Sequence, residues 1–422
     1  MLVYRLNYML ISALLGFTLN AAANAAINIE NCEQLQSIGN NPAMPLDGEY
    51  YQSNDIDCAA IPNFAPIGSH ATPFTGYYNG QGNSIINLRI HSTDLDPSYD
   101  EYVGLFRYLS YATIENIQFN SYTVTSTAYE GSIVGALAGM ASHSTIHNIH
   151  GGPGIVYNEI LGTMPVPGQT GGLLGYLVLS ELKDSSSDAN VTGMGNVGGL
   201  VGNGYSVNIS NNHASGDVTA TPDPSNSSYG SAGGLIGNLD FSSLDNSSAT
   251  GDVVSLDTRA VGAGGLIGRI DGQMGYSAVT QCYASGNVSG TNFVGGLFGF
   301  SGVIVRDSYA TGHVSGATKV GGLIGYAAYN SITNTYATGR VIGTAVDKST
   351  VGGLIGSNDW AIAIDASYWD MDTTGQQNSR GGEGRTTKQM QLIEYDPVNY
   401  PIYVGWTDRE WTFKQGYYPV LK

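Results

Sequence analysis

The sequence predicts an all-β chain folded as a parallel β-solenoid, or β-helix, of about nine to ten coils with N- and C-terminal caps. Three observations support this prediction. A G-G-L-x-G string recurs along the chain, a second half-motif keeps register with it, and the apolar runs are short and β-branched. No segment sustains a helical period over three turns, so these runs are predicted strands bounded by Gly, Asn and Ser turns.

The recurring string sets the period of the repeat. Its leucines are Leu105, Leu137, Leu173, Leu200, Leu235, Leu266, Leu297, Leu323 and Leu354. The shortest spacing, Leu297 to Leu323, is 26 residues and the longest, Leu137 to Leu173, is 36. Such a period indicates stacked supersecondary units, each too small to bury its apolar side chains alone.

The second half-motif contains a polar column. It comprises Asn116, Asn148, Asp184, Asn211, Asn246, Gln281, Asp307 and Asn334. Stacked amides can hydrogen-bond along a solenoid axis, so this column is a predicted corner. The paired glycines of the main motif are expected to provide either positive-φ corners or room for close backbone approach.

The N-terminus is predicted to be a signal peptide, residues 1–25. Arg5 precedes the apolar run from Tyr8 to Leu19, and Ala23-Asn24-Ala25 has the A-x-A pattern of a cleavage site. We therefore expect an exported protein, either secreted or on the cell surface, with the periplasm as a further location. No later run is apolar enough to predict membrane insertion after removal of this segment.

The rest of the chain divides into three predicted parts. Residues 26–102 form an N-terminal cap and first coil, with a lead-in hairpin. Residues 103–357 form the repeat solenoid, and residues 358–422 form a C-terminal cap rich in aromatic residues. Caps are expected because open strand edges promote aggregation.

Composition excludes some partners. The 422 residues include 16 Lys and Arg against 34 Asp and Glu, a formal charge of −18. A chain this poor in cations cannot neutralise many phosphates, so nucleic acid is not an expected partner. A glycan or an extracellular protein is the expected partner, and the protein is expected to be a monomer.

Export to an oxidising compartment determines the expected state of the cysteines. Cys32 and Cys58 flank one segment in an oxidising compartment, so we predict a disulfide between them. Cys282 occupies a repeat position that holds Ser or Thr in other coils and is expected to be a small buried side chain rather than a nucleophile.

Acidic groups were considered as sites. Asp217 and Asp252 occupy one repeat column and could pair as glycosidase carboxylates, but that column continues as Asn, His and Arg, as a solvated face would. The loop 94–101 and the segment Asp370–Gly375 have oxygen ligands that suit Ca²⁺, although the second lacks an acid at the twelfth position. For both, a plain surface role is the favoured interpretation.

Histidine and other motifs give no stronger candidate. His143, His147 and His150 lie close in sequence, but in a strand His147 and His150 point to opposite faces, so zinc is not expected. The Thr123-Val-Thr125 pattern does not repeat, as an ice-binding face would require. No catalytic, cofactor-binding or metal-binding residue is assigned.

One column of tyrosines has two open interpretations. Tyr283, Tyr309, Tyr336 and Tyr368 occupy equivalent repeat positions. They could stack inward as part of the core, or point outward as a recognition ridge for sugar rings or protein partners.

The repeats resemble the GLUG-motif family of secreted and surface bacterial proteins. The resemblance rests on the seven G-G-L-x-G copies, halves such as Ser308-Tyr-Ala-Thr-Gly-His-Val, and Ser367-Tyr-Trp-Asp370. It implies a repeat fold, export and adhesion. We therefore expect a non-enzymatic adhesin that binds a glycan, host or matrix partner. Two alternatives stay open: a polysaccharide-active lyase or hydrolase with carboxylates on one flank, and a purely structural extracellular module. Clustered carboxylates beside exposed aromatics and a basic group would favour the enzyme.

Overall fold

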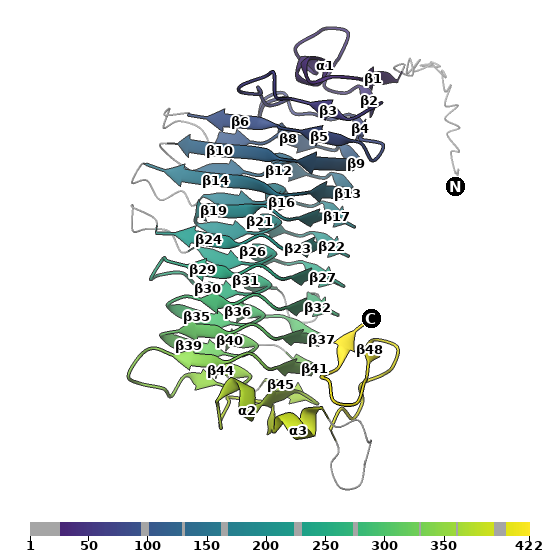
Figure 1. Ribbon diagram of the computed structural model, residues 1–422. Coiled ribbons are helices and arrows are strands. Elements are labelled where there is room, and N and C mark those ends of the chain that lie inside the picture. The colour runs from purple at the N-terminus through teal and green to yellow at the C-terminus, as the bar shows by residue number, and fades with distance from the viewer. Residues whose placement is uncertain are drawn as a thin grey trace, which may run out of the picture.

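The protein is a parallel β-solenoid, as the repeat spacing predicts (Figure 1). The computed structural model describes residues 26–93, 101–128, 131–161, 168–222, 230–272, 277–328, 331–359, 362–391 and 402–422. The predicted signal peptide, 1–25, and residues 94–100 of the acidic loop lie outside these ranges. Each coil contributes in turn to four sheets, here numbered I to IV in chain order.

Sheets I and II contain nine strands each. Sheet I comprises β6 (Arg89–Ser92), β10 (Tyr122–Ala128), β14 (Gly154–Ile160), β19 (Asn190–Met194), β24 (Val218–Thr221), β29 (Val253–Ser255), β34 (Val288–Ser289), β38 (Val314–Gly316) and β42 (Val341–Gly343). Sheet II comprises β7 (Glu101–Val103), β11 (Ser132–Val134), β15 (Gln169–Gly171), β20 (Asn196–Gly198), β25 (Ser231–Gly233), β30 (Gly262–Gly264), β35 (Asn292–Gly295), β39 (Thr318–Gly321) and β43 (Val351–Gly352).

Sheet III also contains nine strands, and sheet IV contains 20. Sheet III comprises β8 (Phe106–Ser110), β12 (Ala138–Ser142), β16 (Leu174–Val178), β21 (Val201–Tyr205), β26 (Ile236–Asp240), β31 (Ile267–Asp271), β36 (Phe298–Ser301), β40 (Ile324–Ala327) and β44 (Ile355–Asn358). Sheet IV comprises β1 (Ile27–Ile29), β2 (Glu49–Gln52), β3 (Ile56–Asp57), β4 (Tyr77–Asn79), β5 (Ser84–Ile86), β9 (Thr113–Asn120), β13 (Thr145–Gly151), β17 (Glu181–Lys183), β18 (Ser186–Ser187), β22 (Asn208–Ser210), β23 (His213–Ala214), β27 (Ser243–Asp245), β28 (Ser248–Ala249), β32 (Ala278–Thr280), β33 (Tyr283–Ala284), β37 (Ile304–Ala310), β41 (Ser331–Ala337), β45 (Ala363–Asp365), β46 (Tyr368–Asp370) and β47 (Glu383–Arg385).

The motif leucines form the centre of the core. All nine have no exposed surface, and they align along the axis because equivalent strands pair in parallel register. Burial of one leucine contributes about 1.5–3 kcal/mol. The motif glycines serve close backbone approach rather than positive φ: a Cβ on Gly199 would lie 2.1 Å from the Gly234 carbonyl oxygen, and one on Gly234 would lie 2.1 Å from that of Gly265.

The polar column forms a corner, as predicted. Its eight residues all have positive φ, between 43° for Asn246 and 59° for Asn116. Asn and Asp adopt this left-handed conformation more readily than other non-glycine residues. Their side chains also hydrogen-bond from coil to coil: Asn246 Nδ2 donates to Asn211 Oδ1 at 2.9 Å, and Asn211 Nδ2 donates to Asp184 Oδ1 at 2.8 Å. The column therefore stabilises both the turn and the stacking.

The N-terminal cap is built from α1 (Cys32–Ser37) and the first strands of sheet IV. Asn31 caps the helix by accepting a hydrogen bond from the Gln34 N–H at 2.9 Å. The lead-in hairpin predicted within residues 64–90 is wrong, because β4 pairs with β2 and β9, and β5 with β3 and β9, all in parallel. The chain enters the solenoid directly and needs no antiparallel turn.

The C-terminal cap has two parts. The short helices α2 (Met371–Thr374) and α3 (Thr387–Met390) lie at the end of the solenoid, and residues 402–422, here called the C-terminal strap, turn back along the outside of sheet IV (Figure 1). The strap contains an antiparallel pair, β48 (Trp411–Thr412) and β49 (Val420–Leu421). None of the helices in the described ranges is long and apolar enough to cross a membrane.

Candidate functional site

The predicted carboxylate pair has a structural role. Asp217 Oδ1 accepts a hydrogen bond from the Asp252 N–H at 2.9 Å, and Asp252 Oδ1 accepts one from the Asn287 N–H at 2.8 Å. The same ladder continues, with Asn287 Oδ1 accepting from the His313 N–H at 3.1 Å. These side chains therefore satisfy backbone donors of the next coil, which explains why both Asp and Asn occur in the column.

The candidate metal ligands are engaged in other contacts. Asp370 is buried, and its carboxylate accepts hydrogen bonds from the Asp372 N–H, the Thr387 hydroxyl and the Tyr418 hydroxyl. The three histidines separate: His143 stacks on a tyrosine, His147 pairs with Glu115, and His150 contacts Ser186. Among the described residues, no group of three or more His, Cys, Asp or Glu side chains is placed to hold a metal ion.

The cysteines take two different roles. Cys32 and Cys58 form a disulfide, with their Cα atoms 5.2 Å apart, which ties α1 to the segment after β3. Cys282 is fully buried, and its Sγ donates to the Thr280 carbonyl oxygen at 3.1 Å, as the Ser308 hydroxyl does to Arg306. Burial raises the pKa of the Cys282 thiol, so this cysteine is not a nucleophile at neutral pH.

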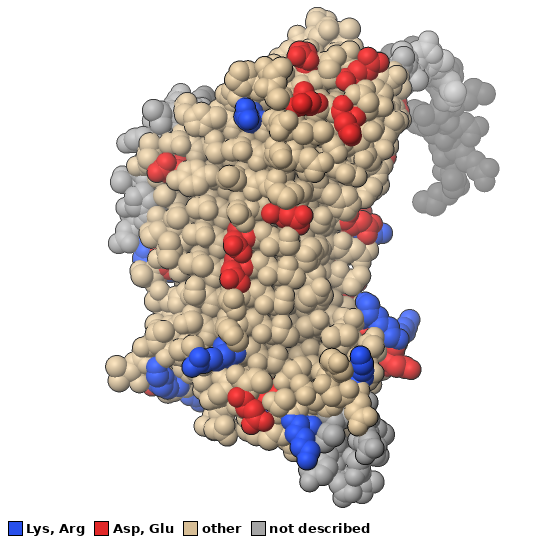
Figure 2. Space-filling model, in the orientation of Figure 1, with Lys and Arg blue, Asp and Glu red and all other residues tan. Residues whose placement is uncertain are grey.

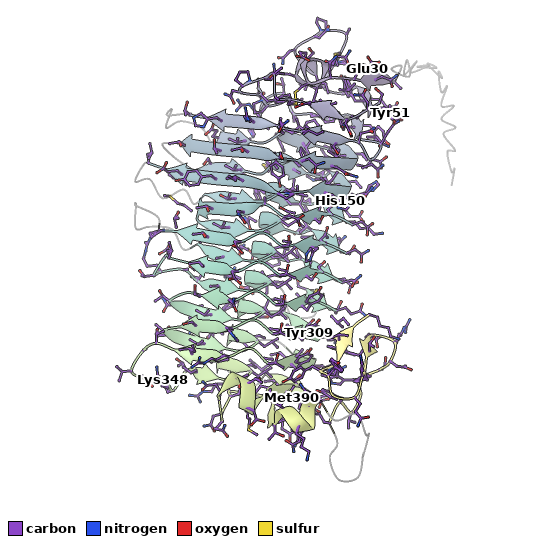
Figure 3. All side chains as sticks on the ribbon, in the orientation of Figure 1. Glu30, Tyr51, His150, Tyr309, Lys348 and Met390 are labelled. Carbon is purple, nitrogen blue, oxygen red and sulfur yellow. A yellow bond between two sulfur atoms is a disulfide. The ribbon has the colours of Figure 1, made fainter. Side chains whose placement is uncertain are left out.

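The tyrosine column faces outward but does not form an open ridge. Tyr309 lies between the core-facing Ser308 and Ala310, and it stacks on Tyr283 at 5.1 Å and on Tyr336 at 4.9 Å. The C-terminal strap covers most of this stack, leaving Tyr309, Tyr336 and Tyr368 only 8%, 1% and 4% exposed (Figure 3).

Neither interpretation of the column therefore holds for these three residues: the side chains are buried, but against the strap rather than in the central core. Tyr283 alone is half-buried, at the edge of the covered stack. Beside it lies a groove of about 370 Å³ between the strap and sheet IV, lined by Tyr283, Tyr309, Tyr417, Tyr418 and Lys414 among others. A recognition ridge of four free tyrosines is wrong, because the strap occupies their outer surface.

A different surface combines polar and aromatic side chains. The middle outward-facing position of the first eight strands of sheet III, β8 to β40, is aligned by the parallel register. We call this column the sheet III strip; it comprises Tyr108, Met140, Tyr176, Asn203, Asn238, Arg269, Phe300 and Tyr326. Most of its members can form hydrogen bonds or stacking contacts with a partner.

Arg269 organises the centre of the strip. Its guanidinium donates to Asp240 Oδ1 at 3.0 Å, to Asp271 Oδ2 at 2.8 Å and to Asn238 Oδ1 at 3.3 Å. Asn238 Nδ2 in turn donates to Asn203 Oδ1 at 3.0 Å. Charge-assisted bonds of this kind fix side-chain geometry. The network is thus a rigid polar surface with little net charge.

Aromatic rings flank this network on both sides. Toward the C-terminus, Arg269 lies over the Phe300 ring at 5.1 Å, and the ring of Phe300 lies 5.6 Å from that of Tyr326. The Lys319 ammonium lies 3.7 Å from the Tyr326 ring centre. Toward the N-terminus, burial raises the pKa of the Tyr176 phenol, with smaller contributions from Tyr205 and Asp240, so its hydroxyl stays protonated at neutral pH.

A row of exposed side chains borders the strip where sheet III turns into sheet IV. We call Tyr111, His143, Leu179, Tyr205 and Phe241 the corner ridge. Tyr111 and His143 stack at 4.6 Å with an interplanar angle of 17°, and Tyr205 and Phe241 meet edge to face at 5.4 Å. Figure 2 shows another flank, on which acidic groups are scattered and Lys and Arg gather toward the C-terminal end.

Sequence reasoning missed both features, although each has a signal. The strip falls three residues after the motif leucine, as in Leu266 to Arg269. The ridge falls six residues after it, as in Leu235 to Phe241; in one coil the exposed side chain is Tyr205, one residue before that position. The residue types differ from coil to coil, so no repeated letter marks the column.

The architecture and the aligned columns define a β-solenoid repeat protein. The family model described as the GLUG motif matches residues 228–254 and 316–342. The chain thus contains the GLUG motif in at least these two repeats, and the resemblance inferred from its sequence is confirmed there.

Two individual proteins are similar to parts or all of the chain. Over 186 residues, 41% of the chain, it is 32% identical to Halomucin of Haloquadratum walsbyi, and it spans 2% of the length of that relative. A solved structure described as a candidate immunoglobulin A1 protease from Bacteroides ovatus aligns with 94% of this chain and 92% of its own, at 17% identity and a TM-score of 0.32. A score that low carries no argument about function.

Proposed function

We propose that this GLUG-motif protein is an exported adhesin-type recognition protein that binds a glycan or an extracellular protein through the sheet III strip, without catalysis. The observation that carries the proposal is the Arg269 network, in which one guanidinium holds two carboxylates and an amide on an outward-facing sheet beside aromatic rings. A pre-organised surface of hydrogen-bonding groups and rings favours binding because little side-chain entropy is lost on contact.

The sheet III strip also has to be compared with the site of a polysaccharide-cleaving enzyme. Two carboxylates, a basic group and aromatic rings together are the features expected of a polysaccharide-cleaving site. General acid catalysis, however, needs a carboxyl group that holds a proton near the working pH. Asp240 and Asp271 both accept hydrogen bonds from the Arg269 guanidinium, so neither is placed as a free proton donor. This arrangement supports recognition over hydrolysis. A purely structural module would not require an exposed network of this kind.

A binding screen with a matched pair of arginine variants tests the proposal. The purified protein would be applied to glycan arrays and matrix proteins, with release of sugar reducing ends assayed in the same wells. Binding that falls at least tenfold in Arg269→Ala and is unchanged in Arg340→Ala, an exposed arginine outside the strip, supports it.

Two results would overturn the proposal. If the protein bound none of the glycans and matrix proteins, the alternative of a purely structural extracellular module would be favoured. Release of reducing ends, lost in Asp240→Asn or Asp271→Asn, would establish the enzyme.

A further inference from the structure

The corner ridge has an unusual backbone conformation for its side chains. Tyr111, His143, Leu179 and Phe241 have φ values of 53°, 50°, 49° and 53°. In this left-handed region the Cβ of an ordinary L-residue is crowded by its own backbone, so bulky side chains are rare there. Each residue directly follows a strand of sheet III, at the point where the coil turns.

The polar column shows what the same chain does when only the turn matters. At that corner all eight residues are Asn, Asp or Gln, which suit positive φ and hydrogen-bond to the next coil. At the corner ridge, the equivalent conformation is given to tyrosine, leucine and phenylalanine instead. Bulky residues at positive φ are unfavourable for the backbone, so the turn itself does not explain why they occur here.

Packing does not explain it either. Tyr111 is 70% exposed, Leu179 50%, Phe241 49% and Tyr205 41%, so these side chains add little to the core. Large apolar side chains that are both exposed and conformationally costly are retained at sites where they contact something else. Two independent observations, exposure and left-handed backbone, thus point to Tyr111, His143, Leu179 and Phe241; in the coil of Tyr205 the left-handed residue is its neighbour Ser206.

The alignment of the corner ridge also constrains the shape of the partner that it contacts. Its members lie on consecutive coils: the Tyr111 N–H donates to the Ser142 carbonyl oxygen, the His143 N–H to Val178, and the Leu179 N–H to Tyr205. The partner must therefore be extended along the solenoid axis. It must present apolar surface to the ridge and hydrogen-bonding groups to the adjacent Asn203 and Asp240, which are only partly buried.

The charge on the strip narrows the chemical class of the partner further. The guanidinium of Arg269, which lies on the strip beside the ridge, is one cation paired with two carboxylates, so a sulfate, phosphate or uronate placed there would meet more negative than positive charge. Resting on the proposed function, we infer that the corner ridge and the sheet III strip together bind a neutral polysaccharide. Its sugar rings would lie flat on the ridge, and its hydroxyls would bond to the strip.

The left-handed conformation provides a discriminating experiment. The variants Leu179→Asn and Phe241→Asn place a residue that tolerates positive φ at each position. They should therefore keep or raise the thermal midpoint of the protein, so a loss of binding in these variants is not a loss of fold. The matched control is Asn211→Gly, a substitution tolerated at positive φ in the polar column.

Binding would be measured by calorimetry with two probes, a neutral β-linked glucan hexasaccharide and a uronate hexasaccharide of equal length. The expected result is binding of the neutral probe only, weakened about tenfold by each ridge variant and unaffected by Asn211→Gly. A neutral disaccharide should bind more weakly than the hexasaccharide, because it reaches fewer coils.

Several outcomes would overturn this inference while leaving the proposed function standing. They are equal binding of the uronate probe, binding of the neutral probe that is insensitive to both ridge variants, and binding only to matrix proteins. A folded protein that binds no glycan and no matrix protein contradicts the proposed function itself.

Discussion

The indole N–H of Trp411 donates a hydrogen bond to the carboxylate of Asp307, 104 positions earlier in the chain, at 3.1 Å. Asp307 is a member of the polar column, so this bond joins the C-terminal strap to a corner of the solenoid. Trp411 is fully buried, and its ring lies 6.0 Å from Tyr309 and 6.1 Å from Tyr336. The strap is thus held by both packing and a charge-assisted bond.

Substitution of Trp411 should release the strap. Loss of a buried tryptophan side chain costs about 3–5 kcal/mol, so Trp411→Ala should expose the tyrosine column to limited proteolysis. Trp411→Phe keeps a ring but loses the bond to Asp307, with an expected cost of about 1.5–3 kcal/mol. Tyr417→Ala, at an exposed strap residue, is the control. Equal protease resistance of all three variants would show that the strap is held in another way.

Loss of the Cys32–Cys58 disulfide should destabilise the N-terminal cap. The bridge closes a loop with a sequence separation of 26 residues, for which chain entropy predicts about 3 kcal/mol of stabilisation. Urea unfolding of Cys32→Ser with and without reductant would measure it. Cys282→Ser should be close to neutral, because serine fills the equivalent buried position at Ser308. An unchanged midpoint for Cys32→Ser would contradict the prediction.

The polar column should accept glycine but resist β-branched residues. Asn211 has φ of 57° and donates to Asp184. Asn211→Val places a branched side chain in the left-handed region, at an expected cost of about 1–3 kcal/mol. Asn211→Gly keeps the turn and loses only the two side-chain bonds, to Asp184 and from Asn246. Thermal melts of the two variants should therefore differ, with valine the less stable; the reverse order would refute a conformational role for the column.

Stability should fall in mild acid because of His213. Burial lowers its pKa from the ordinary 6.5, partly opposed by Asp188, and its Nδ1 lies 2.9 Å from the Ser248 hydroxyl. Below pH 6.5 the unfolded chain binds a proton on this residue before the folded chain does, so stability declines as the pH falls from 6.5 toward the lowered value. In His213→Ser that part of the decline should disappear. A parallel pH profile for variant and parent would be the opposite result.

The repeat made much of the fold predictable. The spacing of motif leucines, such as Leu266 and Leu297, defines the coils because every coil must return to the same core position. The Asn column could be assigned to a corner because its chemistry favours a single backbone conformation. The parallel entry of β1 and β2 could not be seen, since short strands carry no sign of their direction.

The candidate site was less predictable. Tyr309 and Tyr336 carry a clear repeat pattern, but whether they are exposed depends on the strap, whose contacts span more than 80 residues, as in the bond from the Tyr336 hydroxyl to the Pro419 carbonyl oxygen. Arg269 gains its partners only when three coils stack. Residue types vary along the ridge, so its members become visible only after Tyr111 and Phe241 are placed in register.

The parallel register of sheet III has a consequence for avidity. Each coil adds one position to the strip, and each coil in the N-terminal half of the solenoid also adds one to the ridge. The number of coils therefore sets how many weak contacts a long ligand would make at once. Insertion or loss of one complete coil would keep all columns continuous and change this valency by one. Under the proposed function, the length of the solenoid would set how firmly a polymer is held, without a change in any single contact.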